Sequence, residues 1–171
     1  DHQPAGGLRG WKYLAYEGGT RVPFIARWPG HVKRGVDARM ICLTDLLATI
    51  ASLTGRKLPA GTGIDSLDQL RVLTGHPGGP IRSELVEQGI SNTLALRAGE
   101  WKFIPASPQQ EVSGMGSGAN PSDKRWGESI VRDDALSHLA ADPTEQVNLA
   151  TKFPDKVSAM RTRLEEIKRP R

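Results

Sequence analysis

The sequence predicts an α/β fold class in two parts, and the order of its apolar patterns carries this prediction. In the first part, an apolar run over residues 22–28 precedes a helical spacing of apolar residues between 46 and 53. In the second part, a short strand and a β-hairpin precede one amphipathic helix near the end of the chain, which is typical of a small α+β subdomain. The character of the sequence changes near residues 75–80, and we therefore divide the chain into residues 1–77 and 78–171.

The first part is expected to contain one strand and one well-defined helix. Residues 22–28 are followed by Pro29-Gly30, a pair that favours a turn after a strand. The helix over residues 46–53 is followed by Gly55, which stands where a glycine commonly ends a helix. A short helical turn is predicted over residues 66–73.

The second part is expected to form an antiparallel sheet packed by a terminal helix. Leu85 and Val86 mark a short strand, and residues 94–104 read as a β-hairpin with a tight turn at Ala98-Gly99. Residues 105–129 are rich in Ser, Gly, Pro and Gln and are predicted to be a long insertion. Pro154 opens a helix to residue 168, whose apolar seam is Val157, Met160, Leu164 and Ile167.

Composition excludes several classes of function. The 171 residues contain one cysteine, which excludes an internal disulfide and a multi-cysteine zinc site. No apolar run approaches the roughly 20 residues of a membrane span, and the start does not resemble a signal peptide. The net charge of +4 arises within residues 1–80, with ten Lys/Arg against six Asp/Glu, whereas residues 81–171 hold thirteen of each. These cations are spread singly, so we expect an anionic small molecule as partner and neither nucleic acid nor membrane.

The glycine-rich stretch over residues 6–19 is the candidate site. Its small side chains allow close approach to a bound group, and Lys12 within it can meet an oxyanion as a point charge. The alternative for Lys12 is an ordinary surface lysine. His2 and Trp11 are candidate substrate-binding residues, with a frayed terminus and loop packing as their respective alternatives. The stretch is not a phosphate-binding P-loop, because G-x-x-x-x-G-K-[ST] is absent.

Residues 7–25, GLRGWKYLAYEGGTRVPFI, closely resemble the LRGGKGTTYEGGIRVPFI stretch of the sulfatase family. Weaker matches follow in the family's order at residues 28–30, 44–47, 73–75, 95–104 and 141–150. The resemblance implies a type I sulfatase (arylsulfatase), a sulfuric ester hydrolase with the alkaline-phosphatase-like fold. It also implies catalysis by a formylglycine made within C/S-x-P-x-R, a calcium ion held by aspartates and an asparagine, and contact between Lys12 and a sulfate oxygen.

Most of that catalytic apparatus is missing from this sequence. It contains no C/S-x-P-x-R, and Cys42 lies in an Ile-Cys-Leu-Thr-Asp context typical of a buried apolar position. The paired calcium-binding aspartates are also absent, so we assign no metal ligand here and expect formylglycine and Ca²⁺ upstream of this chain. The chain is therefore expected to be the C-terminal portion of a longer sulfatase and to be inactive alone. Residues 1–77 would close the catalytic domain, and residues 78–171 would form the C-terminal antiparallel-sheet subdomain.

Two other functions remain open at this point. One is hydrolysis of phosphonate or phosphate esters by a member of the same superfamily, because those substrates are also tetrahedral anions. The other is a non-catalytic binding module derived from a sulfatase tail. For a sulfatase, the partner would be a small-molecule or carbohydrate sulfate ester, and the resemblance implies a periplasmic or extracellular location. The residues do not indicate an oligomeric state.

Overall fold

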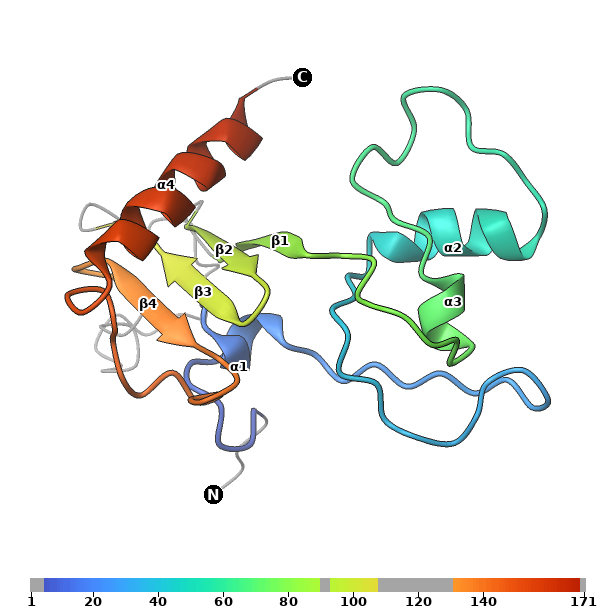
Figure 1. Cartoon of the computed structure of the whole chain (residues 1–171), viewed down its shortest axis with the longest axis horizontal. Coiled ribbons are helices and arrows are strands. Elements are labelled where there is room, and N and C mark those ends of the chain that lie inside the picture. Colours follow the sequence, from blue (N-terminus) through green and yellow to red (C-terminus); the bar gives the residue numbers. More distant parts are fainter. Residues whose placement is uncertain (1–4, 90–92, 108–130, 170–171) are drawn as a thin grey trace, which may run out of the picture. The chain divides into compact units, whose positions relative to one another are not determined.

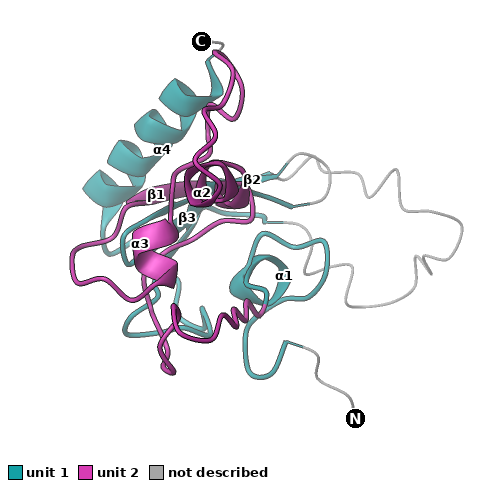
Figure 2. Cartoon of the chain, turned by 90° about the vertical axis from the view of Figure 1, so that its right-hand side faces the viewer, with its two compact units in different colours: residues 1–22, 86–171 teal, residues 23–85 magenta. Residues whose placement is uncertain are grey.

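The computed structural model describes residues 5–89, 93–107 and 131–169. The chain forms two compact units, of which unit 1 combines residues 1–22 with 86–171 and unit 2 comprises residues 23–85 (Figure 2). This division differs from the predicted one after residue 77, because the glycine-rich segment packs with the C-terminal part of the chain. How the two segments are distributed between domains of a longer protein remains a prediction.

Unit 1 is built on a four-stranded sheet with strand order β1-β2-β3-β4 (Figure 1). Its strands are β1 (Glu84–Gln88), β2 (Leu94–Ala98), β3 (Trp101–Ile104) and β4 (Ala135–His138). β2 and β3 form the predicted antiparallel hairpin, with Leu96 opposite Phe103. Gly99 supplies the left-handed conformation that the turn requires, at φ +56°. β4 pairs antiparallel with β3 and was not predicted, because four residues ending in Ser and His carry a weak strand signal.

One face of the sheet packs against helix α4 (Pro154–Lys168) (Figure 1). Side chains alternate between the two faces of a strand, which places Leu96, Phe103 and Leu136 on the same side. Met160 and Leu164 of α4 are buried against them. The predicted helix and its apolar seam are therefore confirmed.

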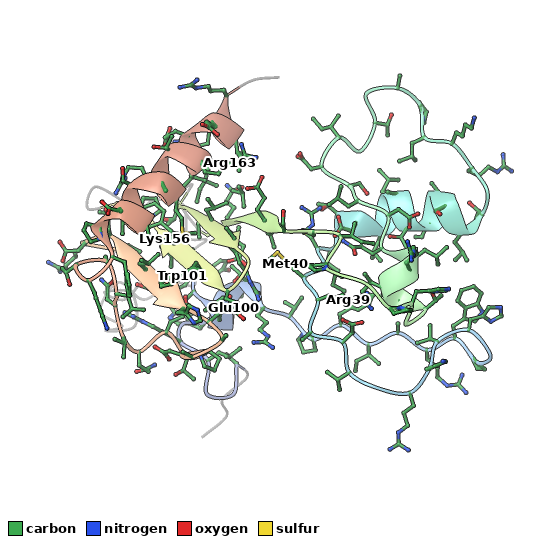
Figure 3. The ribbon with its side chains drawn as sticks, viewed as in Figure 1. Arg39, Met40, Glu100, Trp101, Lys156 and Arg163 are labelled. Atoms are coloured by element: carbon green, nitrogen blue, oxygen red, sulfur yellow. The ribbon has the colours of Figure 1, made fainter. Side chains whose placement is uncertain are left out.

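Trp101 closes the edge of this core. Its side chain is half-buried. Its ring centroid lies 4.7 Å from that of His138 and 5.4 Å from that of Phe153, both edge-on. The Nζ of Lys156 lies 5.6 Å from the ring centroid, so the indole also serves as a cation–π partner for α4 (Figure 3).

The opposite face of the sheet packs against the glycine-rich segment. Ala95, Ile104 and Ala135 form a second core there with residues 14–16, just before the short helix α1 (Glu17–Thr20). Most of the predicted 105–129 insertion lies outside the described residues. No helix in the described part of the chain is long and apolar enough to cross a membrane.

Unit 2 contains helices α2 (Asp45–Leu53) and α3 (Leu70–Leu73). Helix α2 confirms the helix predicted over residues 46–53. Of the helical turn predicted over residues 66–73, only the second half is helical, as α3. The strand predicted over residues 22–28 is wrong, because this segment pairs with no strand among the described residues. Its apolar side chains are largely exposed, with Ile25 90% accessible. A strand is stabilised by a paired neighbour, and an apolar run alone does not supply one.

The carboxylate of Asp45 organises unit 2. Its oxygens accept hydrogen bonds from the N–H groups of Cys42 and Leu67, each at 3.0 Å, and from Gln69 Nε2 at 3.0 Å. Arg82 forms a buried ion pair with the same carboxylate, its Nε lying 3.0 Å from Oδ2. Burial raises the pKa of Asp45, but the bonds from Arg82 and the backbone outweigh this effect and hold it below its ordinary value. The resulting stabilisation is present above the unfolded pKa of about 3.9 and is lost as the pH falls toward the lower folded-state value.

We predict that Asp45→Ala destabilises unit 2 severely, because it leaves the guanidinium of Arg82 buried without its counter-charge. Breaking a buried pair in this way costs about 3–5 kcal/mol. Hydrogen exchange should show faster exchange at the Leu67 and Cys42 amides. Asp37→Ala is the matched control, since it removes a solvent-exposed ion pair with Arg39, and such pairs contribute little to stability. Equal effects of the two substitutions would contradict the central role of Asp45.

Candidate functional site

Residues 9–19, here called the lysine loop, fold back on themselves. Gly18 N–H donates to the carbonyl of Arg9 at 2.7 Å, and Leu14 N–H donates to the carbonyl of Trp11 at 3.0 Å. A Cβ on Gly18 would lie 2.5 Å from the Arg9 oxygen, and one on Gly19 would lie 2.1 Å from the Leu14 oxygen. Both positions therefore require glycine, because the two limbs of the loop, the residues before Lys12 and those after it, touch through their backbones.

The loop is anchored to the sheet by its own apolar residues. Leu14, Ala15 and Tyr16 are buried in the core they share with the sheet. The guanidinium of Arg9 lies 4.2 Å from the centroid of the Tyr16 ring, a cation–π contact between the two limbs. The loop is thus packed along its C-terminal limb rather than projecting freely.

Beneath the loop lies the Lys102 cluster, which we define as Lys102, Glu17, Glu87 and Thr20. The side chain of Lys102 is fully buried. Its Nζ lies 3.0 Å from Glu17 Oε1, 2.6 Å from Glu87 Oε2 and 3.1 Å from Thr20 Oγ1. An ammonium group has three donors, and these three oxygens satisfy them all. The cluster therefore links β3 and β1 of the sheet to helix α1 at the end of the loop.

Further basic groups balance the negative charge of Glu17. Its Oε2 lies 3.8 Å from Arg97 Nη1 on β2 and 3.9 Å from Arg21 Nη1. Glu17 and Arg21 are four residues apart, and their charged groups lie within ion-pair distance of each other. Arg97 reaches Glu17 because strand alternation directs its side chain to the same face as Lys102.

Glu145 contacts the loop from the C-terminal half of the chain. It is 1% exposed, and its Oε2 accepts the Glu17 N–H at 2.6 Å. Its carbonyl accepts a hydrogen bond from Arg9 Nη1 at 3.0 Å. Burial raises the pKa of Glu145 to about 6; Lys102 lowers it, while the charges of Glu17 and Glu87 raise it. Its φ of +54° is unusual for a residue other than glycine.

Lys12 itself is exposed at the turn of the lysine loop. Its Nζ lies 4.7 Å from the centroid of the Tyr13 ring, and it has no ion-pair partner among the described residues. Tyr13 adopts φ +89°, a strained conformation of the kind that clusters at functional sites. Trp11 is half-buried against the core, with its ring 6.3 Å from that of Tyr13. His2 lies outside the described residues, so the roles of Lys12, Trp11 and His2 remain predictions.

Sequence reasoning missed Lys102, Glu87 and Glu145. The available signal for Lys102 was its position between Trp101 and Phe103-Ile104, where a lysine interrupts an apolar strand and must find counter-charges once buried. Glu145 lies in the ADPTEQVNLA stretch that contributed to the family resemblance, but nothing in that stretch indicates its partner.

The described residues do not fit a calcium site. No group of three His, Cys, Asp or Glu side chains lies close enough together among them to hold a metal ion. Two buried glutamates, Glu17 and Glu87, instead bind the ammonium group of Lys102. Cys42 is a free cysteine, partly rather than fully buried, whose N–H donates to Asp45.

We predict that Gly19→Ala disrupts the lysine loop, because the added Cβ would collide with the backbone at Leu14. Overpacking of this kind costs about 1–3 kcal/mol or more, which should lower the Tm by several degrees in a thermal melt. Gly7→Ala is the control, since a Cβ there meets nothing within 4 Å. A Gly19 variant that melts with the wild type would show that the loop does not adopt this closed form.

Comparison with known proteins identifies the family. The chain is 35% identical over 170 residues to an N-acetylgalactosamine-6-O-sulfatase of Bacteroides thetaiotaomicron, covering 98% of this chain and 31% of the relative. It is 31% identical over 153 residues to human arylsulfatase A, covering 85% of this chain and 29% of that protein. No protein-family model matches the chain. The chain thus spans about a third of the length of these relatives.

A solved structure from Bacteroides thetaiotaomicron, labelled 6S-sulf in work on the metabolism of multiple glycosaminoglycans, superposes with a TM-score of 0.81. It is 35% identical, and the match covers 98% of this chain and 33% of that one. The similarity extends over both units and includes the lysine loop. The chain belongs to the sulfatase family and carries part of its alkaline-phosphatase-like fold.

Proposed function

We propose that the protein containing this chain hydrolyses sulfate esters and that Lys12 binds an oxygen of the sulfate group. The observation that carries this proposal is the position of Lys12, which is exposed on a loop whose neighbouring residues 14–16 are packed against the sheet. A lysine on such a loop presents its charge at a defined place, which costs little reorganisation when an anion binds.

Lys12 can act on a sulfate ester by electrostatics alone. Its ammonium group is a compact positive charge that suits an oxyanion, and no carboxylate among the described residues neutralises it. As the bond between sulfur and the ester oxygen breaks, negative charge grows on the oxygens that the lysine contacts. Stabilising that charge lowers the barrier more than it favours the bound substrate, which is the requirement for catalysis.

A sulfated carbohydrate is the substrate class that we propose. The bacterial relative is named for N-acetylgalactosamine-6-O-sulfate chemistry and matches nearly the whole of this chain. Trp11 and Tyr13 flank Lys12, so an aromatic surface lies next to the cationic group. We propose that Trp11, together with His2, contacts the substrate beside the sulfate.

Formylglycine and calcium would be supplied by residues outside this chain. When bound, the calcium ion would polarise the sulfate group as a Lewis acid. The described residues include neither a fitting metal site nor a C/S-x-P-x-R sequence, so the chain alone is expected to be inactive. Its contribution would be the lysine and the packing that holds it in place.

We predict that Lys12→Ala in the full-length protein lowers kcat/KM for an aryl sulfate by about 10²–10³-fold, the usual effect of removing one preorganised electrostatic contact. Assays should be run in parallel with an aryl phosphate and an aryl phosphonate ester. The control is Lys152→Ala, which removes another exposed lysine that lies over a neighbouring aromatic ring.

Each outcome of this assay separates the candidate functions. Turnover of sulfate that depends on Lys12 supports the proposal, whereas a preference for phosphate or phosphonate would replace the substrate class. A full-length, matured protein with no turnover of any of the three esters would favour a binding module. If Lys12→Ala and Lys152→Ala behave alike in an active enzyme, Lys12 has no catalytic role.

A further inference from the structure

We propose that Glu145 is a positioning residue that fixes the lysine loop in the conformation that presents Lys12 to substrate. This inference rests on the proposed role of Lys12 and adds a residue remote from it in sequence. Glu145 does not touch the substrate in this proposal; it acts through the backbone of the loop.

The geometry shows how one residue can hold both limbs of the loop. Through its side chain, Glu145 accepts the N–H of Glu17 on the C-terminal limb at 2.6 Å. Through its carbonyl, it accepts the Arg9 side chain on the N-terminal limb at 3.0 Å. Gly18 N–H joins the same two limbs by donating to the Arg9 carbonyl at 2.7 Å. Lys12 lies between these fixed points.

Glu145 is itself held by a tight turn. The carboxylate of Asp142 accepts the Val147 N–H at 2.8 Å and the Thr144 hydroxyl at 2.9 Å, and the Asp142 carbonyl accepts the Glu145 N–H at 3.2 Å. The bond from Val147 is the largest influence on the pKa of Asp142, which is held below its ordinary value. The turn therefore maintains Glu145 in its left-handed conformation, and a strained residue persists only where its surroundings determine it.

The charge state of Glu145 gives the proposal a signature in pH. Its Oε1 is buried without a hydrogen-bond partner among the described residues. Four charged groups act on Glu145: Arg9 from the lysine loop, Glu17 from α1, Glu87 from β1 and Lys102 from β3. Burial raises the pKa of Glu145 to about 6, against roughly 4.3 for an exposed glutamate. The closed loop therefore binds the proton more tightly than an open loop, and it is favoured as the pH falls from about 6 toward 4.3.

Two substitutions in the full-length protein test the role of Glu145. Glu145→Ala leaves the buried Glu17 N–H without an acceptor, and we expect a loss of roughly 10- to 100-fold in kcat/KM for an aryl sulfate. Glu145→Gln keeps an acceptor oxygen without the charge and should restore most of that loss. Glu165→Gln on α4 is the control, because Glu165 is exposed and pairs only with Lys168 among the described residues. In a Lys12→Ala background, Glu145→Ala should have no further effect on kcat/KM.

Hydrogen exchange at the Glu17 amide supplies a measurement that does not depend on activity. After correction for intrinsic rates, protection in the wild type should increase by roughly 20-fold between pH 7.5 and pH 4.5. Glu145→Gln should give high protection with little dependence on pH, and Glu145→Ala should give low protection. If Glu145→Gln does not fold, the wild-type dependence on pH decides the question alone.

The results separate this inference from the proposed function. Protection at Glu17 that does not change with pH, or Glu145→Ala effects that add fully to those of Lys12→Ala, would overturn the positioning role. If exchange follows the expected pattern but Lys12→Ala leaves sulfate hydrolysis unchanged, Glu145 fixes the loop and the catalytic assignment of Lys12 is wrong.

Discussion

The neutralisation of one buried ammonium group determines how unit 1 is assembled. Lys102 projects from the middle of the sheet, where an unpaired charge would be prohibitively costly. Glu17, Glu87 and Thr20 satisfy it, and two of these three belong to the short helix that ends the lysine loop. The position of the loop is therefore a consequence of the electrostatic requirement of a residue in the sheet.

The two faces of the sheet are stabilised by different interactions. Alternation along the strands sends Leu96 and Phe103 toward α4, where an apolar seam buries them without polar partners. The same alternation sends Arg97 and Lys102 to the other face, where charged groups meet acidic partners around a small apolar core. Burial on the first face stabilises the unit, and polar contacts on the second specify one arrangement of the loop.

Local patterns allowed α2, α4 and the β2–β3 hairpin to be predicted, because each is defined by periodicity or turn residues within a few positions. The strand predicted over residues 22–28 was wrong, since an apolar run does not reveal whether a neighbour pairs with it. The family resemblance directed attention to Lys12, but the contacts that hold its loop join residues 85 and 128 positions apart. A single sequence contains no local signal for such pairs, and the contact between Glu145 and the lysine loop could therefore be recognised only from the structure.

The long separation between Glu17 and Glu145 also has a consequence for biosynthesis. At about 5–20 residues per second, roughly 6–25 s pass between synthesis of the two residues. Throughout that interval the glycine-rich segment lacks its acceptor at Glu145 and helix α4, and for most of it strand β4 is missing as well. The segment that contains Lys12 therefore reaches its final form only after Glu145 has been synthesised, and a ribosome that stalls before residue 145 would leave a nascent chain whose lysine loop is still open.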